Sequence, residues 1–457
     1  MATFLTSTAG LKFTVRRLPA VLVVPAAPTP REMNRLSDID DQDGLRFRVP
    51  IVQLYRRNAS CDGLDPAAVI RDAVARALVH YYPLAGRLRK LEGRKLAVDC
   101  TAEGVPFVEA DADDVRLEDF GDGDSIHPPL PCLEELFFDV PAATSSIANS
   151  PLVHIQVTRL ACGGFILAVQ MSHTVADGQG ILQFLEAVAE LARGAVAPTV
   201  RPVWARDLLL ARNPPRPSFA HREYDELPLD DPIALPADEL VQGSVFFGPQ
   251  DVAAIKARLA PGLRERSTTF DVLTAFLWKC RTMALQLRDT DDEVRLGFAV
   301  SACHGKRGLC LPSGYYGNTI ALPVAISTAG ELCANPVGYA VELVRKAKAE
   351  VDVEYIQSVA DLMVLRGRPN FANARLYMVS DLTKIGFAGL DYGWGQPVYG
   401  GVATMGLSPI PWMSSFLIPC KNAKGESGIV VPLCLPRRAM DRFTEEVGKL
   451  KMRYSSL

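Results

Sequence analysis

The sequence predicts a mixed α/β protein made of two units of similar size. The chain has 457 residues, whereas a typical domain has about 150. Both halves mix short apolar runs, typical of strands, with segments whose apolar residues recur at helical spacing. Between residues 197 and 236, eight prolines interrupt every such period. We therefore expect a first unit at residues 1–196, a proline-rich crossover at 197–236 and a second unit at 237–457.

The expected elements of the first unit follow from apolar runs and helix signals. Asp65 followed by Pro66 combines a capping carboxylate with a first-turn proline, which predicts a helix. Residues 87–100 have the pattern of a hairpin. The acidic stretch 109–114 lacks the spacing of a calcium loop, and we expect it to be a solvated loop. Strands are further expected at residues 20–24, 49–55, 105–109, 153–159 and 165–171, and a helix at 178–193.

The second unit shows the same mixture of periods. Ser267 and Thr268 precede a long apolar segment and are typical of a helix start. Proline and glycine punctuate the remaining segments. We expect strands at residues 243–247, 294–302, 375–380, 412–418 and 428–435, and helices at 250–259, 270–287, around 341–348 and at 438–453.

Composition excludes several classes of function. A formal net charge of -3 gives no general attraction to nucleic acid or to an anionic membrane. No apolar run approaches the roughly 20 residues of a membrane span, and the run at 20–24 is too short and too late for a signal peptide. The ten cysteines show no CxxC spacing and no clustering with histidine, which argues against a disulfide framework and a metal site. We expect a cytoplasmic protein with reduced thiols.

A histidine motif lies at the junction between an expected strand and an expected helix. His173 follows the apolar run 165–169, and the sequence continues as HTVADGQG into the helix. Imidazole titrates near neutral pH, so His173 is the leading candidate for a general base. Asp177 has three possible roles, since it could orient the imidazole, form a structural salt bridge or cap the helix. The alternative for His173 itself is a half-buried structural histidine.

A second motif, DYGWGQP, begins at Asp391. Together, HTVADG and DYGWG resemble the two defining motifs of the plant BAHD acyltransferases, HxxxD and DFGWG, with Tyr392 in place of phenylalanine. Four shorter stretches add to the resemblance in the expected order, so that it covers nearly the whole chain. They are LSDID at 36–40, YPLAGR at 82–87, FLWKCR at 276–281 and YYGN at 315–318.

This resemblance implies a fold and a reaction. BAHD enzymes have two chloramphenicol-acetyltransferase-like domains with a solvent channel between them, which acyl-CoA and the acceptor enter from opposite faces. By similarity, His173 would deprotonate the acceptor, which attacks the thioester without an acyl-enzyme. Asp177 would support the loop. Acyl-CoA would be a co-substrate, with no permanently bound cofactor and no metal, and the protein would act as a cytoplasmic monomer in plant specialised metabolism.

The resemblance also suggests roles for residues of the second unit. Ser380 stands where the family often has a hydroxyl that donates to the oxyanion. Leu382 departs from a position that is often tryptophan, and Cys303 from one that is often arginine. The glycine-rich loop of the second motif would be structural, through Asp391, Gly393, Trp394 and Gly395.

The phosphates of CoA require cations or helix N-termini. Ser267 and Thr268 at a helix start, together with Lys306 and Arg307, are the candidates, although solvated surface charge explains the two cations equally well. YYGN places the chain nearer the alcohol acyltransferases, including the hydroxycinnamoyl-CoA monolignol transferase branch. This predicts transfer of p-coumaroyl, another hydroxycinnamoyl group or benzoyl to a monolignol or benzyl alcohol. The alternatives are an N-acyltransferase acting on an amine, or a non-catalytic homologue that binds a metabolite.

Overall fold

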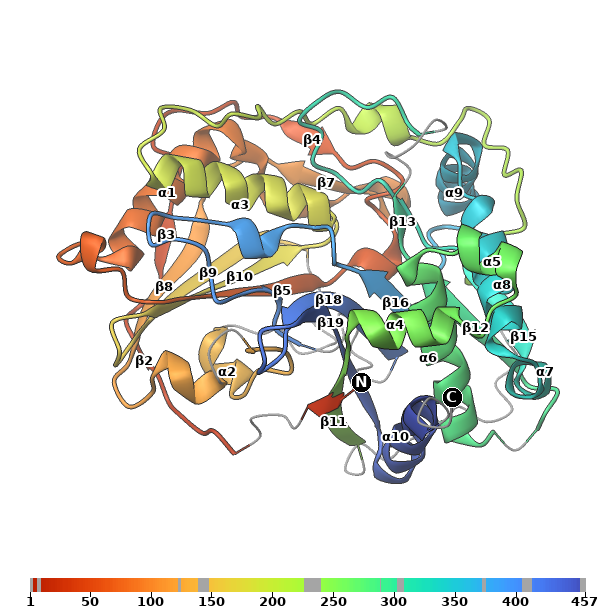
Figure 1. The fold of residues 1–457 in the computed structure, drawn as a ribbon. Coiled ribbons are helices and arrows are strands. Elements are labelled where there is room, and N and C mark those ends of the chain that lie inside the picture. The colour runs from red at the N-terminus through yellow and green to blue at the C-terminus, as the bar shows by residue number, and fades with distance from the viewer. Residues whose placement is uncertain are drawn as a thin grey trace.

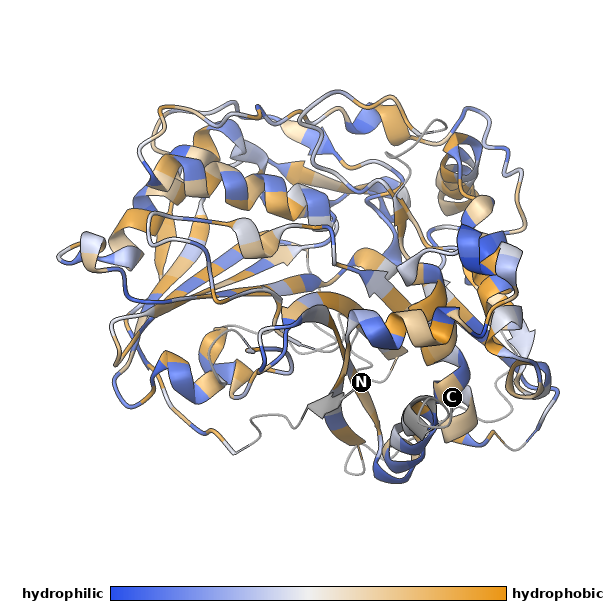
Figure 2. Ribbon diagram, in the orientation of Figure 1, coloured by the Kyte–Doolittle hydropathy of each residue, from blue (hydrophilic) through white to orange (hydrophobic). Residues whose placement is uncertain are grey.

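The computed structural model describes residues 3–5, 10–121, 125–138, 148–225, 240–287, 289–301, 308–371, 375–404 and 413–452. Within these residues the chain forms two large mixed sheets with helices packed on them (Figure 1). The predicted α/β class is therefore confirmed. The apolar strands of both sheets form the interior, and the helices α1 (Pro66–His80) and α3 (Gly178–Ala192) carry polar and apolar residues on different faces (Figure 2).

The first sheet consists of β2 (Arg16–Arg17), β3 (Val21–Val23), β5 (Arg48–Tyr55), β8 (Val105–Ala112), β9 (Val153–Leu160), β10 (Phe165–Ser172) and β17 (Tyr399–Val402). Its order is β17-β5-β10-β9-β8-β2, with β3 paired to β8. The strand β10 runs antiparallel to both neighbours. The helices α1 and α3 pack side by side over this sheet (Figure 1). The arrangement carries the chain along β10 directly to the histidine motif.

The start of α1 shows why the sequence signals worked. The Asp65 carboxylate accepts hydrogen bonds from the backbone N–H groups of Ala67 and Ala68, and Pro66 occupies the first helical position. Ile70, Ala73 and Ala77 recur on one face and are fully buried. The predicted helix is therefore confirmed.

The second sheet consists of β1 (Thr3–Leu5), β11 (Leu240–Phe247), β12 (Glu293–Phe298), β15 (Val324–Thr328), β16 (Leu376–Asp381), β18 (Ser414–Lys421) and β19 (Ser427–Pro436), in the order β1-β11-β19-β18-β16-β12-β15. The buried helix α6 (Thr269–Leu285) is central to the packing of this half. The helices around α6 are α4 (Pro249–Lys256), α7 (Ala329–Ala334), α8 (Val337–Ala349) and α10 (Arg437–Met452).

The two sheets are joined by packing and by exchanged strands. In β18, Phe416 and Ile418 belong to the first hydrophobic core, whereas Leu417 between them belongs to the second. The strand β17, from late in the chain, pairs with β5, and β1, from its beginning, pairs with β11. Strands from each half of the chain thus complete the sheet of the other half. The division into units at residues 1–196 and 237–457 stays a prediction.

Within residues 197–225 the crossover forms the 3-10 turns η6 (Arg206–Leu209) and η7 (Arg222–Tyr224) and one isolated β-bridge from Val203 to Tyr315. The prolines explain this irregular path. It packs on α9 (Val353–Leu365), and the two share a third hydrophobic cluster with Ile39. The rest of the predicted crossover, residues 226–236, lies outside the described residues.

The prediction of a solvated loop for the acidic stretch is wrong for residues 109–112, because β8 continues through Ala112. β8 pairs in parallel with β9, which places the carboxylates of Glu109 and Asp111 beside Arg159. The nitrogen–oxygen distances are 2.6 and 3.3 Å. The carboxylates have a cation as partner, which a reading of local composition does not reveal.

Three helices of the second half were not predicted: α5 (Pro261–Arg266), α7 and α9. The first two have six residues each, too few for a periodic pattern. Other small elements are β4 (Met33–Arg35), β6 (Arg87–Lys90), β7 (Leu96–Asp99), β13 (Val300–Ser301), β14 (Ile320–Ala321), α2 (Leu133–Leu136), η1 (Asp43–Leu45), η2 (Ala59–Cys61), η3 (Tyr82–Ala85), η4 (Glu92–Arg94), η5 (Leu117–Phe120) and η9 (Phe387–Gly389). Among the helices in the described ranges, none combines the length and apolar character needed to span a membrane.

Candidate active site

His173 lies immediately after β10, where the chain turns towards α3. Its backbone N–H donates to the Phe47 carbonyl oxygen at 2.8 Å. Its ring meets the Phe47 ring edge-on, with centroids 5.2 Å apart. The residue is 8% exposed. The imidazole is thus held at the end of a sheet strand with little contact with bulk water.

The surroundings of His173 favour a neutral imidazole. Burial lowers its pKa below the ordinary value, while its own carbonyl, Asp177, the Asn318 side chain and Asp40 oppose the shift. Its Nδ1 atom is buried, and no hydrogen bond of good geometry reaches it from the described part of the chain. A neutral imidazole near pH 7 can accept a proton, which is what a general base requires.

Asp177 caps α3 and does not hydrogen-bond to the imidazole. Its Oδ1 accepts from the backbone N–H groups of Gln179 and Gly180, both at 3.1 Å. Its Oδ2 accepts from the Thr319 N–H at 3.0 Å and from the Thr319 hydroxyl at 3.2 Å. Of the three roles considered from sequence, the structure thus shows the helix cap. The carboxylate also ties the loop to a segment from the second half of the chain.

The other side of the loop rests on a buried ion pair that was not predicted. Arg206 of η6 and Asp40 lie 3.0 Å apart, and both are fully or almost fully buried. Arg206 also donates to the Val175 carbonyl at 2.8 Å. Three aromatic rings surround the guanidinium, with centroids 4.4, 4.8 and 4.9 Å from Cζ, and they belong to Trp204, Tyr315 and Tyr316. The crossover therefore holds the histidine loop through the hydrogen bond from Arg206 to the Val175 carbonyl.

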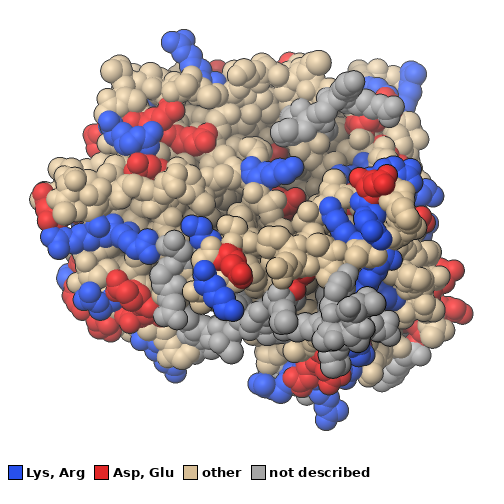
Figure 3. Space-filling model, in the orientation of Figure 1, with Lys and Arg blue, Asp and Glu red and all other residues tan. Residues whose placement is uncertain are grey.

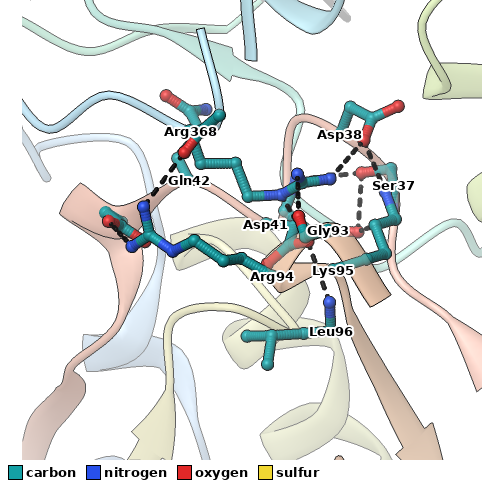
Figure 4. A network of polar contacts seen from close by, with 12 residues as sticks. Ser37, Asp38, Asp41, Gln42, Gly93, Arg94, Lys95, Leu96 and Arg368 are labelled. Carbon is teal, nitrogen blue, oxygen red and sulfur yellow. Dashed lines mark hydrogen bonds and ion pairs between the residues drawn. The ribbon is translucent and has the colours of Figure 1, made fainter. Parts of the chain in front are cut away.

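The segment that carries Asp40 is itself anchored by further charges (Figure 4). Arg368 donates to Asp38 at 3.1 Å and to Asp41 at 2.8 Å. Asp41 also accepts from the Leu96 N–H at 2.9 Å, and Lys95 donates to Asp38. Burial raises the pKa of Asp41, and Arg368 opposes that shift. The LSDID segment, which the sequence offered only as part of the family resemblance, is thus a structural anchor for the site.

Asn318, the last residue of YYGN, connects these parts. Its backbone N–H and its Nδ2 both donate to Asp40 Oδ1, at 2.9 and 2.8 Å. Nδ2 also donates to the His173 carbonyl oxygen at 2.8 Å. The contact spans 145 positions along the chain, and for that reason no local pattern predicts it.

A close backbone approach fixes a glycine of the motif. A Cβ on Gly180 would lie 2.0 Å from the Tyr316 carbonyl oxygen, so this position requires glycine. The YYGN segment therefore presses against the first turn of α3. Four separate parts of the sequence, namely the LSDID segment, the histidine loop, the crossover and YYGN, meet at one point.

Ser380 lies in β16, which ends at Asp381. Leu382 and Ile385, which follow, pack against the first core. A Cβ on Gly178 would lie 3.3 Å from Cδ1 of Ile385, so this segment contacts the beginning of α3. Ser380 is half-buried in the strand that delivers the segment. Its role towards an oxyanion stays a prediction.

The DYGWG loop lies at the opposite end of β10. Asp391 Oδ1 accepts from the N–H groups of Gly393 and Gly395 at 2.7 and 2.9 Å, and both glycines have positive φ. Trp394 packs edge-on against Phe165, the first residue of β10. Phe165 and Ser172 are seven steps apart, about 23 Å at 3.3 Å per residue. The loop therefore contacts the strand that carries the histidine, but at its far end.

Of the four candidates for CoA binding, two can be placed. Ser267 is buried and donates to the Leu263 carbonyl at 2.6 Å. Thr268 caps α6, accepting from the Asp271 N–H at 3.2 Å while its own N–H donates to Asp271 at 2.9 Å. Lys306 and Arg307, like Cys303, lie outside the described residues. A joint role of the four in binding CoA stays a prediction.

The surface charge and the possible metal ligands were compared over the described part of the chain. Lys and Arg alternate with Asp and Glu over the face shown in Figure 3. Across the described ranges, no group of three or more His, Cys, Asp or Glu side chains is arranged to hold a metal ion.

Comparison with solved structures identifies the fold first. The chain is similar to vinorine synthase, with a TM-score of 0.72 and 21% identity, over 96% of this chain and 98% of that chain. At this identity the likeness defines the fold class, in which two α/β halves are joined as described above.

Sequence comparison then gives the family. The model of the Transferase family matches residues 13–450. The chain is 53% identical to benzyl alcohol O-benzoyltransferase of Petunia hybrida, over 96% of this chain and 94% of the relative. It is 54% identical to benzyl alcohol O-benzoyltransferase of Nicotiana tabacum, over 97% and 95%. The protein belongs to this family, the BAHD acyltransferases, and is an O-acyltransferase that uses acyl-CoA as co-substrate.

Proposed function

We propose that this protein transfers an aromatic acyl group from CoA to the hydroxyl of a small primary alcohol, with benzoyl-CoA and benzyl alcohol as the preferred pair. The observation that carries the proposal is the identity of 53% and 54%, along nearly the full length, to two enzymes named as benzyl alcohol O-benzoyltransferases. Transfer of p-coumaroyl to a monolignol remains within the same proposal as a less favoured pair, because no relative described above carries that name.

His173 is the proposed general base. The neutral imidazole takes the proton of the acceptor hydroxyl, and the oxygen attacks the carbonyl carbon of the thioester. The tetrahedral intermediate then collapses, the carbon–sulfur bond breaks and the CoA thiolate leaves. The imidazolium is positioned to return its proton to that sulfur. The lowered pKa of His173, caused by burial, supports this role because the base is unprotonated at pH 7.

The remaining residues have supporting roles in the proposal. Asp177 holds the loop by capping α3 and binding Thr319. Ser380 is the proposed donor to the oxyanion, and the α6 N-terminus at Ser267 and Thr268, with Lys306 and Arg307, is the proposed region for the CoA phosphates. Two half-buried cations flank that helix start, since Arg345 and Lys348 lie 3.4 and 3.0 Å from the buried carboxylate of Asp271.

A substrate matrix tests the proposal. The purified protein is incubated with benzoyl-CoA, p-coumaroyl-CoA or acetyl-CoA against benzyl alcohol, coniferyl alcohol or a polyamine, while free thiol and conjugate are followed. We expect benzyl benzoate to form fastest, and no ester to form with His173→Ala. If the amide with the polyamine formed fastest, the acceptor would be an amine and not an alcohol. If His173→Ala turned over at the wild-type rate, the assignment of His173 as the general base would be refuted.

A further inference from the structure

The Asn318 side chain has one atom whose hydrogen-bonding capacity is unused. The residue is fully buried. Its Nδ2 donates to Asp40 Oδ1 and to the His173 carbonyl, each at 2.8 Å, which uses both amide hydrogens. Its Oδ1 accepts no hydrogen bond of good geometry from the described residues. A buried acceptor without a donor is unfavourable and requires an explanation.

His173 has the complementary atom. If Nε2 is the base, the neutral imidazole carries its proton on Nδ1, which is then a donor. Nδ1 is buried and also lacks a partner of good geometry. An unused acceptor and an unused donor therefore belong to two residues that are already joined through the His173 carbonyl. Burial has the largest effect and lowers the pKa of His173, whereas its own carbonyl, Asp177 and then the Asn318 carboxamide raise it.

We infer that Asn318 is a positioning residue for His173, which holds the histidine carbonyl through Nδ2 and receives Nδ1–H at Oδ1, so that Nε2 is left as the base. The inference rests on the proposed function, since it assigns a role only if His173 takes the proton. One carboxamide would hold the histidine at two points. Its own orientation is fixed by Asp40, which in turn is paired with Arg206.

The carboxylate expected to orient a catalytic histidine is engaged elsewhere. Asp177 accepts four hydrogen bonds, from two N–H groups of α3 and from the N–H and hydroxyl of Thr319. A neutral amide in its place stabilises the imidazolium less than an anion would, because the amide carries no charge. The charged and titratable groups that face His173 are thus Asp177 on its own loop and Asp40 from the LSDID segment. Asp40 in turn is paired with Arg206, and both interact with Tyr315.

The test is a steady-state and pH analysis of Asn318→Ala. We expect kcat to fall about 10- to 100-fold, because a misplaced base costs that order of rate, while KM for both substrates stays within about twofold of wild type. The acidic limb of the plot of log(kcat/KM) against pH should move to lower pH, because a group that raised the pKa of His173 is gone.

Ser358→Ala is the matched control, since Ser358 is fully buried in α9 and does not contact the histidine loop. It should lower the thermal midpoint without changing kcat or the pH profile. If Asn318→Ala is not recovered folded, Asn318→Ser keeps a hydroxyl that can donate to Asp40 and is measured in the same way.

The outcomes separate the inference from the function. If His173→Ala is inactive but the Asn318 variants keep kcat within twofold of wild type, the inference fails and the proposed function stands. A fall in kcat with an unshifted pH profile also overturns it, because that pattern indicates general damage. If His173→Ala turns over normally, the proposed function fails first.

Discussion

The molecule contains two buried histidines with very different surroundings, His173 at the end of β10 and His221 in the crossover. His221 has the contacts of a hydrolytic triad: Nε2 lies 2.7 Å from the Ser358 hydroxyl, and Nδ1 lies 3.0 Å from Glu223 Oε1. His173 has no such partners. By contacts alone, His221 would be the better candidate for a catalytic residue.

The directions of the hydrogen bonds around His221 argue against a catalytic role. The Ser358 oxygen accepts from the N–H groups of Ser218 and Phe219, at 2.8 and 3.1 Å, so its own hydrogen must go to His221. Nδ1–H of His221 then donates to Glu223, which also accepts from the Tyr355 hydroxyl at 2.8 Å. Ser358 is 0% exposed. Every polar atom named here has a partner, and no substrate reaches the hydroxyl.

The difference between the two histidines lies in how much hydrogen-bonding capacity is left unused, and not in the number of contacts. The cluster around His221 ties the irregular crossover to α9, because residues 354, 358 and 361 on one face of that helix bind crossover groups. The His173 ring instead makes no hydrogen bond of good geometry to a described residue, and the residue is 8% exposed, so Nε2 is left for a substrate if Nδ1 is held by Asn318. The two sites therefore predict opposite effects of mutation.

The largest contrast should come from replacing each histidine with alanine. His173→Ala should lose about a hundred- to ten-thousandfold in kcat, the usual contribution of general base catalysis, with a thermal midpoint close to wild type. His221→Ala should keep kcat and lose stability. Product formation and thermal unfolding, measured on the same preparations, check both. Equal losses of activity in the two variants would contradict the different roles assigned to His173 and His221.

Ser358→Ala should have the next largest effect. It leaves two buried N–H groups and one imidazole nitrogen without their partner, and each unsatisfied group costs about 1 to 3 kcal/mol. We expect a clear fall in the free energy of unfolding, measured with urea, and unchanged turnover of the folded fraction. A turnover defect larger than twofold would mean that the cluster communicates with the site.

The pH dependence of turnover should follow the lowered pKa of His173. Because burial depresses the pKa of His173 below 6.5, kcat/KM should stay constant down to about that pH and fall about tenfold per unit only below the lowered value. The stability contribution has the same sign: it is fully present above the unfolded value of about 6.5 and is lost as the pH falls through the folded pKa. An acidic limb above pH 7 would contradict the assignment.

Tyr392→Phe should have the smallest effect and provides a baseline. The hydroxyl of this fully buried residue distinguishes the DYGWG loop from the family's DFGWG pattern. The loop packs on the end of β10 that is remote from His173, so kcat should not change. We expect the free energy of unfolding to change by no more than about 1 kcal/mol, by urea titration. A change in kcat would show that the far end of β10 influences the base.

The sequence predicted most of the elements and the place of the histidine motif between a strand and a helix, but not the contacts that hold this loop. His173 and Asp177 lie in one local motif, and α1 has local start signals, so both could be recognised from neighbouring residues. Asp40 and Asn318 are 278 positions apart, and chain folding alone brings them together. The Ser358 cluster likewise joins residues 137 positions apart. The helix α9 was missed despite its capping residue Asp352 and the helical spacing of Ile356, Val359 and Ala360.

The pairing of β17 with β5 has a consequence for how the protein is made. Tyr399 pairs with Leu54, so one edge of β5 waits for a partner that emerges from the ribosome some 345 residues later. At translation rates of about 5 to 20 residues per second, this delay is roughly 17 to 70 s. During that time an apolar strand edge is available to other nascent chains. Until β17 has been made, this edge of β5 therefore lacks its partner, and truncation before residue 399 would remove that partner altogether.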